Sequence, residues 1–217
     1  MNSTTYNQDC IAGMKRFPDK HFELAIVDPP YGSDNIIGGY TSNKGGGMYK
    51  KNYNAALWDQ PRPGPEYFTE LFRVSKNQII WGANHYISMM PIDASCWIVW
   101  DKDTFKSHFA DCELAWTSFP TAVRKFKFRW SGFMQGNMKD KENRIHPTQK
   151  PVQLYKWLLM NYAQPGDKIL DTHLGSGKSR IAANLLGFDF TGFELNEGYY
   201  KDQEKRFKQI SSQPQLL

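Results

Sequence analysis

Four consecutive residues, Asp28-Pro29-Pro30-Tyr31, could do chemistry on a flat polar ligand. The two prolines fix an extended backbone and have no amide hydrogen to donate, while their carbonyl oxygens remain as acceptors. The turn thus combines a carboxylate, fixed carbonyls and an aromatic ring, a set that suits a planar group bearing an amino substituent. The alternatives are a structural turn with Asp28 as a cap, and a Walker-B-like aspartate, which would need a complete Walker loop elsewhere.

A glycine-rich segment, Asp171-Thr172-His173-Leu174-Gly175-Ser176-Gly177, lies between a strand pattern and a helix pattern. Glycine lets the backbone approach a ligand closely, and a helix N-terminus offers free amides. The segment could be a tight turn, a phosphate loop or a loop for S-adenosylmethionine. A phosphate loop would need glycine where Thr172 stands. A loop for S-adenosylmethionine requires an acid at the end of the next strand to accept the ribose hydroxyls, and Glu194 stands there.

These two segments together suggest methylation of a base amine. Such an amine is a poor nucleophile because its lone pair is delocalised into the ring. Hydrogen bonds from its N–H groups to Asp28 and to the Pro29 carbonyl would favour a pyramidal nitrogen, and Tyr31 could stack on a base flipped out of the duplex. The sulfonium carries its own leaving group, so the protein mainly aligns the reactants. Asp28 is a candidate for taking the released proton, although an ordinary aspartate is a weak base.

Short apolar runs that alternate with helix patterns indicate how these residues are positioned. The patterns predict strands at 22–27, 78–81, 95–100, 112–117, 168–171 and 190–194, and helices at 66–74, from Pro151 to Tyr162, at 179–186 and after an Asn196 cap. This alternation is typical of an α/β fold with a parallel sheet covered on both faces. Because ligands bind beyond the carboxyl ends of such strands, we expect one site to contain both segments.

The bulk composition narrows the class. A length of 217 residues suits a single domain spanning 1–217, and a net charge of +5 favours nucleic acid as partner. Cys10, Cys96 and Cys112 contain no C-x-x-C pair, so we expect neither a disulfide framework nor a metal site, and a cytoplasmic location. The N-terminus is polar, and the apolar runs are too short to span a membrane.

Basic residues gather between Arg124 and Arg144. They are Arg124, Lys125, Lys127, Arg129, Lys139, Lys141 and Arg144. Alternation from Arg124 to Trp130 predicts a strand with one basic and one aromatic-rich face. The functional interpretation is contact with DNA phosphates. The alternative is a solvated edge strand whose charges deter aggregation.

Together, the motifs resemble the amino-methyltransferases of DNA, specifically the circularly permuted, beta-type group. Asp28–Tyr31 matches the catalytic motif, and His146-Pro-Thr-Gln-Lys-Pro151 matches the signature that precedes the cofactor loop. Asp171–Gly177 matches that loop, with Thr172 and His173 as departures from the usual residues. Further matches cover the ribose-binding strand end, the helix after it and the segment that contacts the cofactor adenine: Phe193–Asn196, Tyr199-Tyr200 and Asp9-Cys10.

The resemblance implies a Rossmann-like fold with a seven-stranded, mostly parallel sheet, S-adenosylmethionine as donor, and methylation of adenine N6 or cytosine N4 in DNA. Aspartate at the first motif position is more typical of the adenine type. The implied catalytic residues are Asp28, Pro29, Pro30 and Tyr31. The implied cofactor-binding residues are Asp9, Cys10, Asp28, Thr148, Lys150, Asp171, Thr172, His173, Leu174, Gly175, Ser176, Gly177, Glu194 and Leu195.

The family's target-recognition region corresponds here to about 118–145, which is short. A predicted mobile loop at about 32–65, rich in glycine, or a second subunit in a homodimer could supplement it. Trp58 in that loop resembles a recurring family feature. The DNA contacts that we expect are Trp58, Arg124, Lys125, Lys127, Arg129, Lys139 and Arg144.

Other functions remain open at this point. An RNA substrate would use the same chemistry. A protein glutamine methyltransferase usually carries Asn-Pro-Pro-Tyr, so Asp28 argues against it. An inactive nucleic-acid-binding module would not need Asp28, Tyr31 and Glu194 intact.

Overall fold

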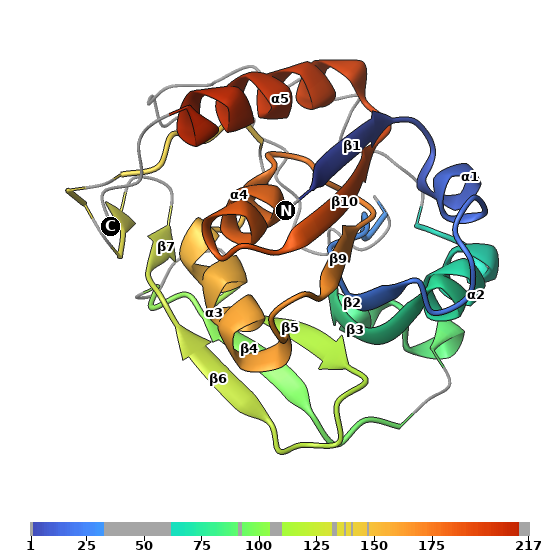
Figure 1. Ribbon diagram of the computed structural model, residues 1–217. Coiled ribbons are helices and arrows are strands. Elements are labelled where there is room, and N and C mark those ends of the chain that lie inside the picture. The colour runs from blue at the N-terminus through green and yellow to red at the C-terminus, as the bar shows by residue number, and fades with distance from the viewer. Residues whose placement is uncertain are drawn as a thin grey trace.

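The computed structural model describes residues 2–32, 62–90, 93–104, 110–131, 134–136, 138–139, 141–146 and 148–212. Its centre is an eight-stranded sheet with the order β1-β10-β9-β2-β3-β5-β4-β6 (Figure 1). The strands are β1 (Ser3–Asn7), β2 (Phe22–Val27), β3 (Ser75–Trp81), β4 (Trp97–Asp101), β5 (Cys112–Thr117), β6 (Arg124–Lys127), β9 (Lys168–Asp171) and β10 (Asp189–Glu194). A separate hairpin pairs β7 (Trp130–Ser131) with β8 (Met134–Gln135).

The sheet is mostly parallel, as the sequence predicts. Within this sheet, as far as the structure describes it, only β5 runs antiparallel to its neighbours, β3 and β4. The expected number of seven strands is wrong by one, because β6 adds an eighth strand parallel to β4. Phe126 of β6 packs against the core while its neighbours Lys125 and Lys127 are exposed, so the alternating pattern of this segment suits a sheet edge.

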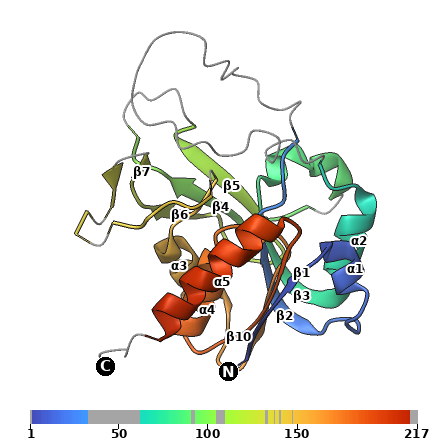
Figure 2. The ribbon, with the colours of Figure 1, turned by 90° about the horizontal axis from the view of Figure 1, so that it is seen from above.

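Helices cover both faces of the sheet (Figure 2). One face carries α1 (Cys10–Met14), α2 (Pro65–Val74) and the short 3-10 turns η3 (Ala83–His85) and η4 (Ile87–Met89); the other carries α3 (Val152–Tyr162), α4 (Lys178–Leu185) and α5 (Glu197–Ser211). Strand β2 serves both layers. Leu24 and Ile26 join the core beneath α3 and α4, whereas Ala25 and Val27 join the core beneath α2. Burial on both faces explains why the second part of this strand, Leu24–Val27, is a continuous apolar run.

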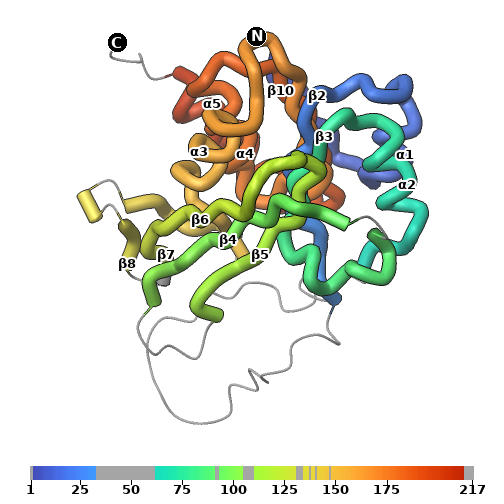
Figure 3. The backbone as a smooth tube through the Cα atoms, turned by 90° about the horizontal axis from the view of Figure 1, so that it is seen from below, coloured from blue at the N-terminus to red at the C-terminus, as the bar shows by residue number. Residues whose placement is uncertain are grey.

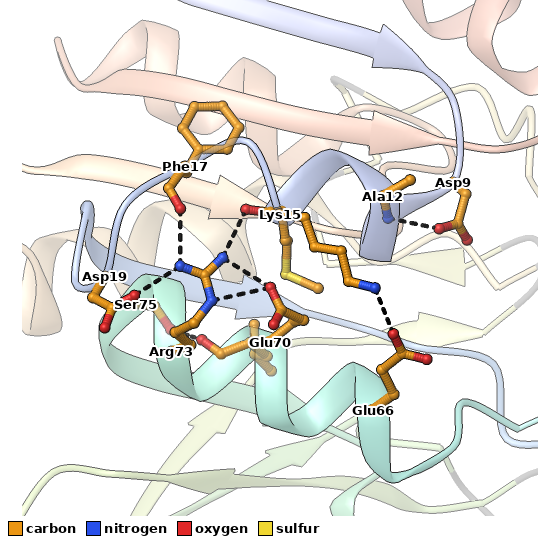
Figure 4. Close-up of polar contacts among 11 residues, drawn as sticks. Asp9, Ala12, Lys15, Phe17, Asp19, Glu66, Glu70, Arg73 and Ser75 are labelled. Atoms are coloured by element: carbon orange, nitrogen blue, oxygen red, sulfur yellow. Dashed lines mark hydrogen bonds and ion pairs between the residues drawn. The ribbon is translucent and has the colours of Figure 1, made fainter.

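Arg73, in the last turn of α2, ties that helix to α1 and the segment after it (Figure 4). Its guanidinium donates to the carboxylates of Glu70 and Asp19 and to the backbone carbonyls of Met14 and Phe17. The Met14 carbonyl at the end of α1 also accepts from the Phe17 amide at 3.0 Å, so Arg73 adds a second hydrogen bond there. These contacts hold the C-terminal end of α1 in place. At its N-terminal end the helix is capped by Asp9, whose carboxylate accepts from the Ala12 amide at 2.8 Å.

Most predicted elements form close to their predicted bounds. Strands β2, β5 and β9 match them, and the Asn196 side chain caps α5 by accepting from the Tyr199 amide. Strand β3 begins earlier than predicted, at Ser75, and β1 and α1 have no counterpart in the predicted elements. In the described part of the chain, no helix is long and apolar enough to cross a membrane. Residues 33–61, which hold most of the predicted mobile loop, lie outside the described residues.

Candidate active site

The two predicted motifs meet at one edge of the sheet. Strands β2 and β9 are parallel neighbours, and their register pairs Ala25 with Leu170, so the two strands end at nearly the same level. A cavity of about 240 Å³ opens between the turns that follow them. Its lining is Asp28, Pro29, Pro30, Tyr31, Gly32, His146, Thr148, Gln149, Lys150, Tyr155, His173, Leu174, Gly175, Ser176, Glu194 and Tyr199. This is the position that open α/β sheets use for ligands.

The Asp28 carboxylate is held by side chains. The Tyr31 hydroxyl donates to Oδ1 at 2.9 Å, and the Lys150 ammonium lies 2.6 Å from Oδ2. The Lys150 side chain is only 3% exposed and also lies 2.9 Å from Glu113 Oε2, whereas the Asp28 side chain is 17% exposed. Asp28 therefore presents an oriented acceptor to the cavity.

The proline carbonyls are fixed by Tyr86, which follows η3. Its hydroxyl lies 2.9 Å from the Pro29 oxygen and 2.5 Å from the Pro30 oxygen, and donates towards both. Burial and the nearby Asp28 charge raise the pKa of Tyr86 above its ordinary value, so this hydroxyl keeps its proton. A carbonyl oxygen has two lone pairs. The Pro29 oxygen can therefore accept a second hydrogen bond.

Tyr31 lies against a glycine. Gly82 ends β3 with a left-handed φ of 66°, and a Cβ atom built there would stand 2.0 Å from Tyr31 Cε1. On another side the Tyr31 ring stacks on His85, with centroids 4.8 Å apart and an interplanar angle of 19°. Only glycine allows both the backbone conformation and the close approach of the ring. Gly82 thus fixes the position of the Tyr31 ring.

The glycine loop holds two carboxylates through backbone amides. Glu194 accepts from the amides of Gly175 and Asn196, each at 2.8 Å, and the residue is 8% exposed. Asp171 accepts from the His173 amide at 3.0 Å and from Ser179 Oγ at 2.5 Å. Burial raises the pKa of Asp171 to about 7. Glu194 is therefore a preformed acceptor on the cavity wall, and Asp171 braces the loop from behind.

Two histidines line the cavity in their neutral form. Burial lowers the pKa of His146 and of His173 to about 4. Thr148 Oγ1 lies 3.1 Å from His146 Nδ1, and Thr172 Oγ1 lies 2.9 Å from His173 Nδ1. At neutral pH these rings add polar surface without positive charge.

Most of the predicted catalytic and cofactor-binding residues are gathered in the lining, and six of them are not. Asp171 and Thr172 are buried behind the loop, and Leu195 is 58% exposed. Gly177, with φ of 71°, begins α4. Asp9 and Cys10 lie at the start of α1, after the neighbouring strand β1. For these residues a direct role in binding stays a prediction.

The predicted DNA-contacting segment forms the edge strand β6 and the β7–β8 hairpin beside it (Figure 3). Lys125 lies 3.6 Å from Asp101, and Lys127 and Arg129 each lie 2.9 Å from Asp103. The aromatic face packs inward, with Phe126 on Trp157. Arg124 and Lys139 are exposed and Arg144 is half-buried, while Trp58 lies outside the described residues.

Sequence reasoning missed several lining or supporting side chains, among them Tyr86, Tyr155 and Glu113. Tyr155 stands in the apolar pattern of α3, so it looks like a core residue. Glu113 does not follow the carboxyl end of a strand, which is where the sequence pattern predicts ligand-binding residues. Strand β5 is antiparallel and brings its first residues to this edge instead. A charged residue that opens an otherwise apolar strand, as Glu113 does before Leu114-Ala115-Trp116, is the signal that could have found it.

The mostly parallel sheet, the glycine turn after β9 and the acid at the end of β10 together define the class of Rossmann-like, S-adenosylmethionine-dependent methyltransferases. Residues 51–205 match the family model N6_N4_Mtase, described as DNA methylase. The chain belongs to this DNA methylase family, which confirms the resemblance and the expected cofactor, S-adenosylmethionine.

Known proteins agree with this membership. The chain is 23% identical over 264 residues to the type II methyltransferase M2.MboI of Moraxella bovis, covering 97% of this chain and 89% of the relative. TTHA0409 of Thermus thermophilus, solved with S-adenosyl-L-methionine, has a similar fold with a TM-score of 0.63 at 17% identity, covering 97% and 96% of the two chains. The cytosine-N4-specific PvuII DNA methyltransferase matches with a TM-score of 0.63 at 11% identity, covering 97% and 90%.

Proposed function

We propose that this DNA methylase transfers the methyl group of S-adenosylmethionine to N6 of adenine in DNA. The observation that carries the proposal is the Asp28 carboxylate, oriented by Tyr31 and Lys150 on the wall of a cavity that Glu194 also lines. Aspartate at this motif position is the feature that favours adenine over cytosine.

Asp28 and the Pro29 carbonyl would accept the two N–H groups of the target amine. Both acceptors are held before the base arrives, Asp28 by two side chains and Pro29 by Tyr86. Holding the acceptors in advance lowers the entropic cost of orienting the nitrogen lone pair, and such alignment is a large contribution to an in-line displacement. Tyr31 would hold the flipped base by stacking. The base would either displace His85 from the Tyr31 ring or stack on the opposite face of that ring.

The described residues fit the cofactor. Glu194 offers carboxylate oxygens to the ribose hydroxyls from a position fixed by two amides. The neutral His146 and His173 avoid repelling a cationic ligand, and acidic side chains line the same cavity. When bound, S-adenosylmethionine supplies an electrophilic methyl group on a sulfonium. Thr148, Leu174 and Ser176 complete the wall on which the ligand would lie.

For DNA binding we propose phosphate contacts by the basic residues of the 124–144 segment: Arg124, Lys125, Lys127, Arg129, Lys139 and Arg144. Strand β6 runs parallel to β4, so its carboxyl end lies at the same edge as Asp28. The ion pairs of Lys125 and Lys127 with Asp101 and Asp103 have exposed lysines. Such exposed pairs are weak, so a phosphate can replace the carboxylate at little cost. A homodimer would add a second recognition surface. The molar mass of the protein in solution tests whether it dimerises.

Cytosine N4 is the second candidate. A carboxylate and fixed carbonyls suit any exocyclic amine, and the cytosine-N4-specific PvuII enzyme shares the fold. The choice therefore depends on the target base itself.

The test is tritiated methyl transfer from S-adenosylmethionine to unmethylated duplex DNA, followed by separation of the nucleosides. We expect label in N6-methyldeoxyadenosine, and none with Asp28→Ala. Label in N4-methyldeoxycytidine would show that the target base is cytosine and not adenine. No label above that of Asp28→Ala on any duplex would contradict the proposal.

A further inference from the structure

Lys150 stands between two carboxylates. Its ammonium nitrogen lies 2.6 Å from Asp28 Oδ2, 2.9 Å from Glu113 Oε2 and 5.4 Å from the centre of the Trp81 ring. Burial favours the neutral amine, but the charges of Asp28 and Glu113 outweigh it and raise the pKa of Lys150 above its ordinary value. A nearly inaccessible ammonium is stable only with such compensation. The two carboxylates therefore share one buried cation.

Glu113 reaches this site from an unusual direction. The register of β3 and β5 pairs Trp81 with Ala115, so Glu113, two residues earlier, lies beyond the carboxyl end of β3. Its other oxygen, Oε1, lies 2.5 Å from the Lys102 ammonium. Although burial opposes ionisation, Lys150 and Lys102 lower the pKa of Glu113 to about 2. Glu113 is thus ionised at neutral pH.

The alternation of charges matters for the chemistry at Asp28. The target nitrogen forms its bond to the methyl carbon as the carbon–sulfur bond breaks, and the electron pair of that bond stays on sulfur. The nitrogen becomes positive and then loses one proton, which passes to the Asp28 carboxylate that accepts its N–H and from there to solvent. An ammonium beside Asp28 without a second counter-charge would oppose that positive charge and would hold Oδ2 against the incoming amine. Glu113, 2.9 Å from the Lys150 ammonium, supplies the second counter-charge.

We propose that Glu113 is a positioning residue for methyl transfer. It attracts the Lys150 ammonium and balances its charge, so that Asp28 can accept the target amine. The inference rests on the proposed function, because it requires Asp28 to be the acceptor. Glu113 acts through Lys150, so its effect should depend on Lys150 being charged.

The experiment compares single-turnover rates of methyl transfer to unmethylated duplex DNA, with enzyme in excess, and Kd for S-adenosylmethionine by calorimetry. For Glu113→Gln we expect a rate about 10- to 100-fold lower, with Kd changed less than about twofold. Glu113→Asp, which keeps the charge, should recover most of that loss. On a Lys150→Met background, Glu113→Gln should change the rate less than about twofold.

The matched control is Glu66→Gln. It makes the same chemical change in an exposed ion pair. The Glu66 side chain is 63% exposed and that of its partner, Lys15, is 56% exposed. Its rate should equal that of the wild type, because the pair lies on the helix layer away from the cavity lining.

The inference is overturned if Glu113→Gln transfers methyl at the wild-type rate. It is also overturned if Glu113→Asp is as slow as Glu113→Gln with equal loss of cofactor affinity, or if Glu113→Gln slows the Lys150→Met variant as much as the wild type. Should Glu113→Gln fail to fold, the comparison on the Lys150→Met background decides. A wild type that methylates no base amine overturns the proposed function and this inference together, whereas an active wild type with an unaffected Glu113→Gln overturns the inference alone.

Discussion

The two halves of the cavity hold their carboxylates in different ways. Glu194, on the side that we propose binds the cofactor, accepts hydrogen bonds from backbone amides 2 and 19 positions away. Asp28, on the proposed transfer side, is held by the Tyr31 hydroxyl and by Lys150, which is 122 positions away. Backbone amides are fixed once the turn forms, whereas side-chain partners can move or exchange. The difference suggests a rigid cradle for the cofactor and an adjustable acceptor for a base that must enter and leave.

The largest effect is expected on the adjustable side. Asp28→Asn replaces the anionic acceptor by an amide and leaves Lys150 with one counter-charge fewer. We expect the single-turnover rate of methyl transfer to fall about 10³-fold, with Kd for S-adenosylmethionine nearly unchanged. A parallel rise in Kd would show that the two halves are not separate.

The cofactor side should respond in the opposite sense. Glu194→Ala removes an acceptor that two amides hold in place, so we expect Kd for S-adenosylmethionine to rise about 10- to 100-fold, as for the loss of charged hydrogen bonds. DNA binding without cofactor, measured by fluorescence anisotropy, should stay within twofold. Equal loss of both affinities would contradict the division.

The packing of Tyr31 can be tested at Gly82. Gly82→Ala combines a left-handed φ with overlap of the Tyr31 ring, so we expect a loss of about 2–5 kcal/mol in the free energy of unfolding, together with slower transfer. Gly187→Ala is the matched control, because its φ is 80° and its added Cβ would meet nothing within 4 Å. It should lose only about 1–2 kcal/mol. Urea unfolding measures both, and equal losses would dismiss the contact with Tyr31.

The smallest effect concerns pH. His146 and His173 have folded pKa values lowered to about 4, so the stability they contribute is present above pH 6.5 and is lost as pH falls towards 4. Asp171 has a folded pKa raised to about 7, so its contribution is present below pH 3.8 and is lost as pH rises through 7. The two trends oppose each other between pH 4 and pH 6.5.

Asp171→Asn should therefore steepen the loss of stability on acidification from pH 6.5 to pH 4.5, by up to about 1.4 kcal/mol per pH unit. His173→Gln should make the same loss shallower. Urea unfolding at several pH values measures both slopes, and unchanged slopes would mean that these groups titrate alike in the folded and unfolded chain.

The cofactor side was the easier half to predict from the sequence. Its strand, glycine turn and acid are close together in the chain, so the 168–194 pattern contains nearly all of the geometry. The transfer side showed Asp28 and Tyr31, and the family signature pointed to Lys150. Glu113, Tyr86 and Gly82 come from other strands and turns, and only the pairing of β5 with β3 brings Glu113 near Asp28. Long-range register is what local patterns do not contain.

The basic segment shows a second limit of the same kind. Its alternation predicts a strand from Arg124 to Trp130, and β6 forms at Arg124–Lys127 as the last strand of the sheet. The aspartates that pair with it, Asp101 and Asp103, lie at the end of the neighbouring strand and after it. Charge counting over 124–144 alone overestimates how basic this surface is.

Strands β2 and β9 end at nearly the same level of the sheet. This alignment constrains where the chain can gain or lose residues during evolution. One residue inserted within β2 would shift Asp28 by about 3.3 Å and turn its side chain to the opposite face of the sheet. A single insertion or deletion in 25–28 or 170–175 should therefore be eliminated by selection, whereas the turn at Pro165-Gly166, where an added Cβ on Gly166 would meet nothing within 4 Å, can absorb one. Insertions and deletions in descendants of this gene should therefore be absent from the ends of β2 and β9.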